Sequence, residues 1–139
     1  KQQQHTMKRA IKIDAYERTV TVVQINEEDY KDIPKAIGCD LFCVGTYLPN
    51  GDALMVDDEG WLKEEVSKGF SLRGFGDGIF AGNGLIVGSD EEGGTDDVKT
   101  ELIDLNMKIG FMADDVEITD DIRNDMTQVT ITDWDGNEL

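Results

Sequence analysis

A glycine-rich stretch at residues 74–88, with the sequence GFGDGIFAGNGLIVG, constrains the fold of this chain more than any other feature. Glycine at this density indicates a backbone that enters conformations, or approaches neighbouring groups, that a side chain would prevent. The stretch closes in the apolar run of Leu85, Ile86 and Val87. It is therefore either a loop that holds a ligand or a set of tightly turned strands in the core of a sheet.

The spacing of these glycines argues against a nucleotide site. A dinucleotide-binding loop needs G-x-G-x-x-G between a strand and a helix, but each glycine series here has one residue too many and no helix start after it. Arg73 is the one cation nearby, and Asp77 and Asp90 would repel a phosphate group. We therefore expect bends and bulges in a small sheet, with Gly82 and Gly84 serving the backbone rather than a ligand.

Two hairpins are predicted in the first half of the chain. Residues 10–14 and 19–25 are runs rich in β-branched side chains with a short polar connection, which is typical of paired strands. Residues 40–48 predict a buried strand and residues 53–56 its partner. Between them an Asn-Gly pair ending at Gly51 favours a tight hairpin turn, so Gly51 is also expected to serve the backbone.

A short helix is predicted between the two hairpins. Asn26 stands where a helix N-cap is expected, and the acidic residues after it suit the positive end of a helix. Ile33 and Ile37 share one helical face, and Gly38 is placed to end the helix. Pro34 argues against an uninterrupted helix and predicts a kink or a restart.

The second half gives a weaker pattern. Thr95 is a second predicted N-cap, followed by a helix to about residue 104 and a strand at residues 106–112. A short helix after Thr119 and a short strand at residues 129–132 complete the prediction.

These elements predict an α+β fold with one domain at residues 7–112, built on a small antiparallel glycine-rich sheet with one or two short helices. Residues 1–6 are expected to be a remnant of an expression tag. Residues 113–139 are expected to form an acidic C-terminal extension that docks on the domain, because a disordered tail rarely needs a tryptophan such as Trp134.

Charge is distributed unevenly along the chain. Without Lys1, 12 basic residues stand against 30 acidic ones, so the net charge is −18. Residues 7–87 carry 14 acidic and 9 basic residues, whereas residues 88–139 carry 16 acidic and 3 basic ones. So much like charge repels nucleic acid and anionic membranes. No apolar run approaches the ~20 residues of a membrane-spanning helix, and we expect a cytoplasmic protein that does not bind DNA or RNA directly.

The side chains that usually carry catalysis or bind metals are scarce. His5 is the only histidine and lies in the predicted tag, so the chain lacks the usual general base near neutral pH. Clusters of carboxylates at residues 57–59, 90–92 and 133–138 do not reproduce the spacing of an EF-hand loop. We therefore predict neither an enzyme nor a resident metal or cofactor.

Cys39 and Cys43 are the only cysteines. Four residues of a strand span ~13 Å, which exceeds the ~7 Å limit between the Cα atoms of a disulfide. Both thiols are predicted to be reduced, free and buried.

Three segments carry a resemblance to a known family. They are residues 8–14 (KRAIKID), 51–60 (GDALMVDDEG) and 81–93 (AGNGLIVGSDEEG). In these segments the chain resembles a family of small acidic domains without assigned function, found in bacteriophages, plasmids and Gram-positive bacteria. The resemblance covers most of residues 7–112. It implies a mobile genetic element as the source of the protein and brings no catalytic residues with it.

The function predicted from these features is that of a non-enzymatic, acidic interaction protein, which binds a host or defence protein with a basic surface. Asp114, Asp115, Asp120 and Asp121 are the predicted partner-binding residues. Mimicry of nucleic acid is one version of this function. A compact chain of this length is about 36 Å across, and duplex DNA of that length carries about 21 charges. An ordinary solvated surface explains the same charge, and a small-ligand or nucleotide-binding domain using residues 74–88 is the alternative function.

Overall fold

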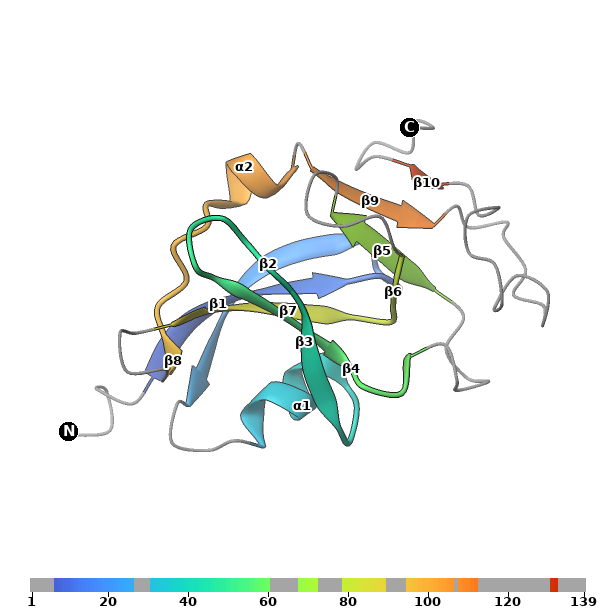
Figure 1. Cartoon of the computed structure of the whole chain (residues 1–139). Coiled ribbons are helices and arrows are strands. Elements are labelled where there is room, and N and C mark those ends of the chain that lie inside the picture. The colour runs from blue at the N-terminus through green and yellow to red at the C-terminus, as the bar shows by residue number, and fades with distance from the viewer. Residues whose placement is uncertain are drawn as a thin grey trace.

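The computed structural model describes residues 7–26, 31–60, 68–72, 79–89, 95–106, 108–112 and 131–132. Two antiparallel sheets hold most of them (Figure 1). The larger sheet contains β1 (Met7–Asp14), β2 (Thr19–Asn26), β3 (Phe42–Tyr47), β4 (Ala53–Asp57), β7 (Gly84–Ser89) and β8 (Thr95–Asp96). The smaller sheet contains β5 (Gly69–Leu72), β6 (Phe80–Ala81), β9 (Ile109–Met112) and β10 (Ile131–Thr132).

The predicted α+β class is wrong, because the fold is essentially all-β. The helices in the described residues are α1 (Asp32–Ile37) and α2 (Leu102–Asn106), with 6 and 5 residues. Helices this short are not stable by themselves in water. They are held by the apolar side chains that they place against the sheets, so the strands determine the architecture.

Apolar side chains pack on both faces of the larger sheet. On one face, Ile86 of β7 belongs to a buried cluster with Phe70 and Phe111 of the smaller sheet. On the other face, Leu85 of the same strand belongs to a cluster with Ile37 of α1. Neighbouring residues of a strand point to opposite faces. The continuous apolar run at the end of the glycine-rich stretch therefore fills both layers of the core.

The glycine-rich stretch supplies the central strand of the larger sheet. β7 lies between β1 and β4, and all of its residues except Ser89 are buried. A Cβ on Gly84 would lie 2.6 Å from Cζ of Phe70, which is too close for two carbon atoms, and Gly82 has a φ of 72°. Both glycines serve the backbone, as predicted. Residues 73–78 of the region lie outside the described residues.

Both predicted hairpins are present. β1 pairs with β2 from Met7 opposite Asn26 to Asp14 opposite Thr19. β3 pairs with β4, and Gly51 in the connecting turn has a φ of 94°.

The predicted start of the first helix is wrong, whereas its end is confirmed. Asn26 is the last residue of β2, and its backbone N–H donates to Oδ2 of Asp32 at 2.8 Å. The helix begins at Asp32, which places Pro34 in the first turn, where a missing N–H costs no helical hydrogen bond. Gly38 ends the helix in the left-handed conformation, with a φ of 88°.

The second half of the chain is also more extended than predicted. Thr95 is not an N-cap but begins β8, where it lies opposite Ser89 of β7. The helix occurs only at α2, and the strand predicted from residue 106 is present as β9. β10 pairs with β9, and the helix predicted after Thr119 falls outside the described residues. In the described ranges, no helix is both long and apolar enough to cross a membrane.

Candidate functional site

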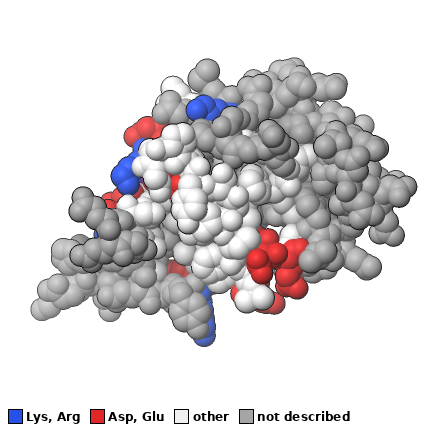
Figure 2. All heavy atoms as spheres, viewed as in Figure 1, with Lys and Arg blue, Asp and Glu red and all other residues white. Residues whose placement is uncertain are grey.

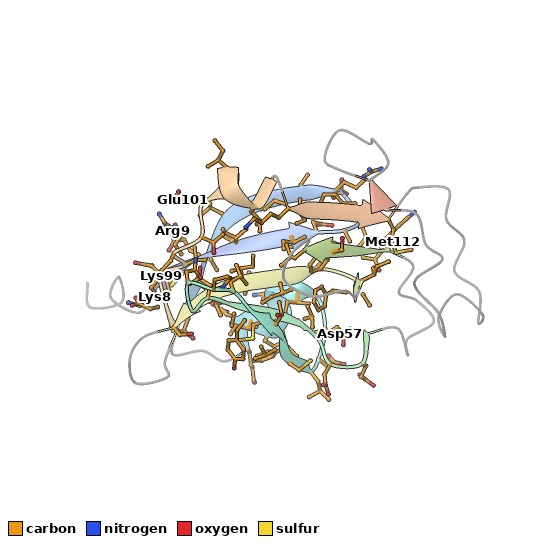
Figure 3. The ribbon with its side chains drawn as sticks, turned by 45° about the horizontal axis from the view of Figure 1, so that its top comes forward. Lys8, Arg9, Asp57, Lys99, Glu101 and Met112 are labelled. Carbon is orange, nitrogen blue, oxygen red and sulfur yellow. The ribbon has the colours of Figure 1, made fainter. Side chains whose placement is uncertain are left out.

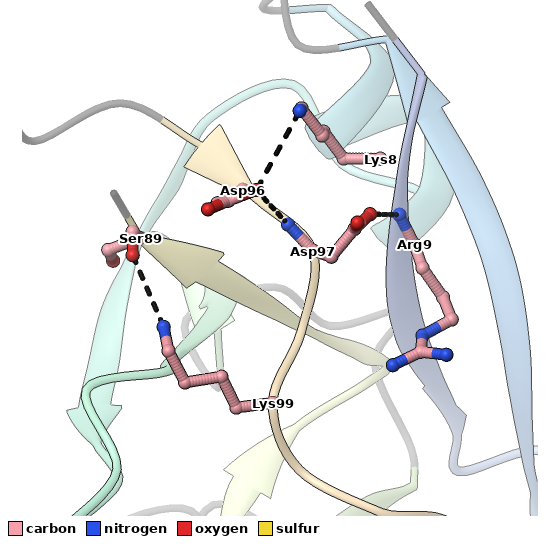
Figure 4. Close-up of polar contacts among 6 residues, drawn as sticks. All are labelled: Lys8, Arg9, Ser89, Asp96, Asp97 and Lys99. Atoms are coloured by element: carbon pink, nitrogen blue, oxygen red, sulfur yellow. Dashed lines mark hydrogen bonds and ion pairs between the residues drawn. The ribbon is translucent and has the colours of Figure 1, made fainter. Parts of the chain in front are cut away.

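Acidic side chains next to β8 are used to hold the fold together (Figure 4). The backbone N–H of Arg9 donates to Oδ1 of Asp97 at 2.8 Å, and the N–H of Val98 donates to the carbonyl of Arg9 at 2.9 Å. Nζ of Lys8 lies 3.7 Å from Oδ1 of Asp96. The backbone N–H of Asp97 is the main cause that lowers the pKa of Asp96, and the charge of Lys8 adds to it.

Asp52, in the turn between β3 and β4, fastens the chain that follows β8. Its Oδ2 accepts hydrogen bonds from the N–H of Lys99 at 2.9 Å, and from the N–H and hydroxyl of Thr100 at 2.8 and 2.7 Å. The side chain is fully buried, and Oδ1 has no hydrogen-bond partner among the described residues. Asn50 donates from Nδ2 to the same Thr100 hydroxyl oxygen. Asp52 therefore serves as an internal acceptor that joins two distant segments.

The aspartates predicted to bind a partner, Asp114, Asp115, Asp120 and Asp121, lie outside the described residues. The structure therefore does not place them relative to one another. Two of the acidic residues that it does describe in the C-terminal part, Asp96 and Asp97, act as hydrogen-bond acceptors within the fold.

The edge strand β3 is exposed, which corrects the prediction of a buried strand at residues 40–48. Among the described strands, β3 pairs with β4 alone. Three large apolar side chains on or next to it are exposed: Leu41 at 58%, Val44 at 39% and Tyr47 at 67%. The sequence pattern predicted the strand from its apolar content, but its place at the end of the sheet leaves these side chains uncovered.

A β-bulge at Gly45 determines which face the exposed side chains share. Val44 lies opposite Met55, and the register then shifts so that Tyr47 lies opposite Ala53. Met55 and Ala53 both belong to the face that packs on α1. Without the extra residue, Tyr47 would point to the other face. The bulge thus places Val44 and Tyr47 side by side on the face that carries α1. We call Leu41, Val44 and Tyr47 the β3 patch.

An open hollow of about 470 Å³ lies beside the start of β3. The residues that line it come from α1 and from the segment that leads into β3: Lys31, Pro34, Lys35, Cys39, Asp40, Leu41 and Phe42. Phe42 packs into the cluster on the α1 face, so the hollow and the β3 patch lie on the same face. The lining that the structure describes is mostly apolar, and its charged members are Lys31, Lys35 and Asp40.

The sequence of residues 7–110 matches the family described as Domain of unknown function (DUF3846). The chain belongs to this family. Comparisons with curated proteins and with solved structures gave no match. The predicted resemblance to a family without assigned function is thus confirmed over residues 7–110.

In this DUF3846 domain neither cysteine forms a disulfide, but both are partly exposed rather than buried. Cys39 lies between α1 and β3, not on the strand, and its thiol donates to the carbonyl of Leu41 at 3.2 Å. Burial raises the pKa of the Cys43 thiol, and the nearby carboxylate of Asp58 raises it further. Cys43 thus favours its neutral form and is not an activated nucleophile.

Charge on the visible face of the DUF3846 domain is divided into separate groups (Figure 2). Uncharged surface occupies the centre of this face, over the β3–β4 hairpin, and acidic groups lie at its border, one of them near the end of β4. Asp57 marks that end of the sheet, whereas Lys8, Arg9 and Lys99 lie together away from it (Figure 3). In the part of the chain that the structure describes, no group of three His, Cys, Asp or Glu residues could hold a metal ion.

Proposed function

We propose that this DUF3846 domain is a non-enzymatic protein-binding module, and that it binds an extended segment of its partner along β3. The observation that carries the proposal is an edge strand whose exposed side chains Val44 and Tyr47 share one face. A peptide in extended conformation can add to such an edge through backbone hydrogen bonds, while alternate side chains contact one face of the sheet.

The sequence of β3 supports this function. Exposed edges are usually protected by charged residues, proline or bulges, because they otherwise pair with other chains. β3 has the sequence FCVGTY, without charge or proline. Its bulge carries a glycine, where a Cβ would lie 2.8 Å from Cε1 of Phe80. The other edge, β2, exposes mainly threonine and glutamine, with Val22 as its one large exposed apolar side chain.

The strong negative charge has a separate role in this proposal. It attracts a partner with a basic surface over a distance of about a Debye length, ~8 Å at physiological salt, and so raises the rate of association. Asp114, Asp115, Asp120 and Asp121 are proposed to contribute to this attraction. The proposed partner is a host or defence protein met by a mobile genetic element, and mimicry of nucleic acid is the strongest form of this role.

Affinity capture with a pair of matched variants tests the proposed function. Val44→Glu places a charge in the β3 patch, and Val22→Glu places the same charge at a similarly exposed position on β2. A specific partner should be captured from lysate of the host by the native protein and by Val22→Glu, but not by Val44→Glu, provided that all three melt at similar temperatures. Binding at β3 would be contradicted if both variants capture the partner in equal amounts, or if neither variant changes the amount captured by the native protein.

A further inference from the structure

We infer that the segment that adds to β3 pairs with Phe42 and Val44, and that it carries a lysine or arginine between two apolar residues. The basic side chain faces Asp58. This inference rests on the proposed strand addition at β3, and it specifies where the partner pairs and what chemistry it brings.

Two hydrogen bonds, one at each end of the β3–β4 hairpin, show which residues bond across it. The N–H of Asp58 donates to the carbonyl of Leu41 at 3.0 Å. At the other end, the N–H of Leu48 donates to the carbonyl of Asp52 at 2.8 Å. Bonded and non-bonded pairs alternate along an antiparallel ladder. Counted inward from the two ends, the residues whose N–H and C=O groups point to the open edge are Phe42, Val44 and Tyr47.

The bulge at Gly45 divides these backbone groups into two sets. Phe42 and Val44 are two residues apart, which is the spacing of a regular strand. Val44 and Tyr47 are three residues apart, because the bulge inserts one residue between them. A regular strand that bonds to Phe42 and Val44 is therefore out of register at Tyr47. The first set offers two donors and two acceptors, whereas Tyr47 offers one of each, so the added strand pairs at the start of β3.

The two faces of β3 ask for different side chains. Side chains of an added strand alternate between the faces. Those opposite Phe42 and Val44 lie on the α1 face, where the exposed side chain of Val44 favours apolar neighbours. The residue between them lies opposite Cys43, whose side chain packs against the cluster on the other face. The segment therefore needs an apolar residue on each side of this central position.

Asp58 determines the residue at the central position. It lies opposite Leu41 in the register of the hairpin, so its side chain is on the face of Leu41 and Cys43. Burial is the main cause that raises the pKa of the Cys43 thiol, and its hydrogen bond with the carboxylate of Asp58 raises it further. Asp58 is exposed and forms no salt bridge with the residues that the structure describes. A residue opposite Cys43 has its Cβ atom ~5 Å from that of Cys43, so a long basic side chain there reaches this carboxylate.

Other charges near the start of β3 agree with a basic segment. Asp57 ends β4 and Asp40 precedes β3, and Figure 2 shows an acidic group near the end of β4. Lys31 and Lys35 line the hollow on the α1 face, so the sheet lies between them and Asp58. The net charge of −17 also favours a basic partner.

The test uses nuclear magnetic resonance of the ¹⁵N-labelled full chain with the peptide acetyl-Thr-Val-Lys-Val-Thr-amide. Its sequence reads the same in both directions, so one peptide covers parallel and antiparallel addition. Versions with Gln or Glu in place of Lys are compared with it. We expect the Lys peptide to shift the amide signals of Phe42 and Val44 most. It should bind roughly fivefold more tightly than the Glu peptide at low salt, because one exposed ion pair replaces a repulsion. The difference should shrink as salt rises.

A charge reversal separates recognition by Asp58 from attraction by the acidic chain as a whole. In Asp58→Lys the preference for the Lys peptide should disappear. The control variant Glu17→Lys makes the same change in net charge at an exposed position between β1 and β2, which are separated from β3 by β7 and β4. It should keep the native preference.

The outcomes separate this inference from the proposed function. If the three peptides shift the β3 amides with equal affinity, or if Asp58→Lys keeps the preference, the role of Asp58 is wrong while binding at β3 stands. Shifts centred on Tyr47 would contradict pairing at the start of β3. If no peptide shifts the β3 amides, the proposed function and this inference are both wrong. Both are also wrong if the β3 signals broaden with protein concentration before any peptide is added, because a second copy then occupies the edge.

Discussion

Replacing Asp52 with alanine should destabilise the fold by about 3 kcal/mol. The Oδ2 atom accepts three hydrogen bonds of 2.7 to 2.9 Å, at a residue with no exposed surface. A hydrogen bond to a charged group contributes roughly 1.5–3 kcal/mol, so the three set an upper bound of about 9 kcal/mol. Part of this is offset, since alanine also removes the cost of burying a carboxylate. The remaining loss of stability is mainly the cost of two backbone N–H groups left without an acceptor.

Urea unfolding measures this loss. With a slope of about 1–3 kcal/mol per molar urea for a small domain, a change of about 3 kcal/mol moves the midpoint by roughly 1–3 M. Hydrogen exchange supplies the local test, because the amides of Lys99 and Thr100 should lose protection. Asp52→Asn should cost only about 1 kcal/mol, since an amide oxygen can still accept these bonds.

Asp14→Ala is the matched control. Oδ1 of Asp14 also accepts two backbone N–H groups, those of Tyr16 and Glu17, but in an exposed turn where water can replace the carboxylate. Its cost should be about 1 kcal/mol or less. If Asp52→Ala costs no more than Asp14→Ala, or if Lys99 and Thr100 exchange as slowly as before, the reasoning about this buried acceptor is refuted.

Three other changes test the turns, the sheet packing and the thiol. Gly84→Ala should cost about 1–3 kcal/mol of stability, because its Cβ would lie 2.6 Å from Phe70. Thermal melts of Gly84→Ala with and without Phe70→Leu check this. If the double variant recovers no stability, the prediction is contradicted. Gly51→Ala should cost only about 1 kcal/mol, since its φ of 94° is strained for alanine but no atom lies within 4 Å of the new Cβ. A loss as large as that of Gly84→Ala would mean that the turn is packed. Alkylation of Cys43 is measured with the other cysteine changed to serine. Its rate should reach half of its maximum above pH 9.0, because the folded state raises the pKa of the thiol above that value. Asp58→Asn should lower the pH of this half-maximal rate. The raised pKa also favours folding below pH 9.0, and this contribution should fade as pH rises through the pKa of Cys43 in the folded state. A half-maximal alkylation rate at or below pH 9.0 would contradict the raised pKa.

Local chemistry in the sequence was sufficient for several elements. Both hairpins follow from strand-forming runs joined by short turns, and Gly51 marks the second turn through the conformation that glycine adopts there. Gly38 ends α1 for the same reason. These features depend on neighbouring residues only, so a pattern along the chain contains them.

Non-local packing decided the class of the fold and the candidate site. Thr95 has the chemistry of an N-cap, yet its backbone pairs with Ser89 of β7, a strand held between β1 and β4 in the larger sheet. Asp52 follows the turn of the second hairpin, and only the fold brings the N–H of Thr100 to its carboxylate. The run at β3 looked like core because its composition is apolar, but a strand at the end of a sheet has a neighbour on one side only. Composition determines which side chains are more stable when buried. The order of the strands is set by contacts between distant segments, and it determines which of these side chains are buried.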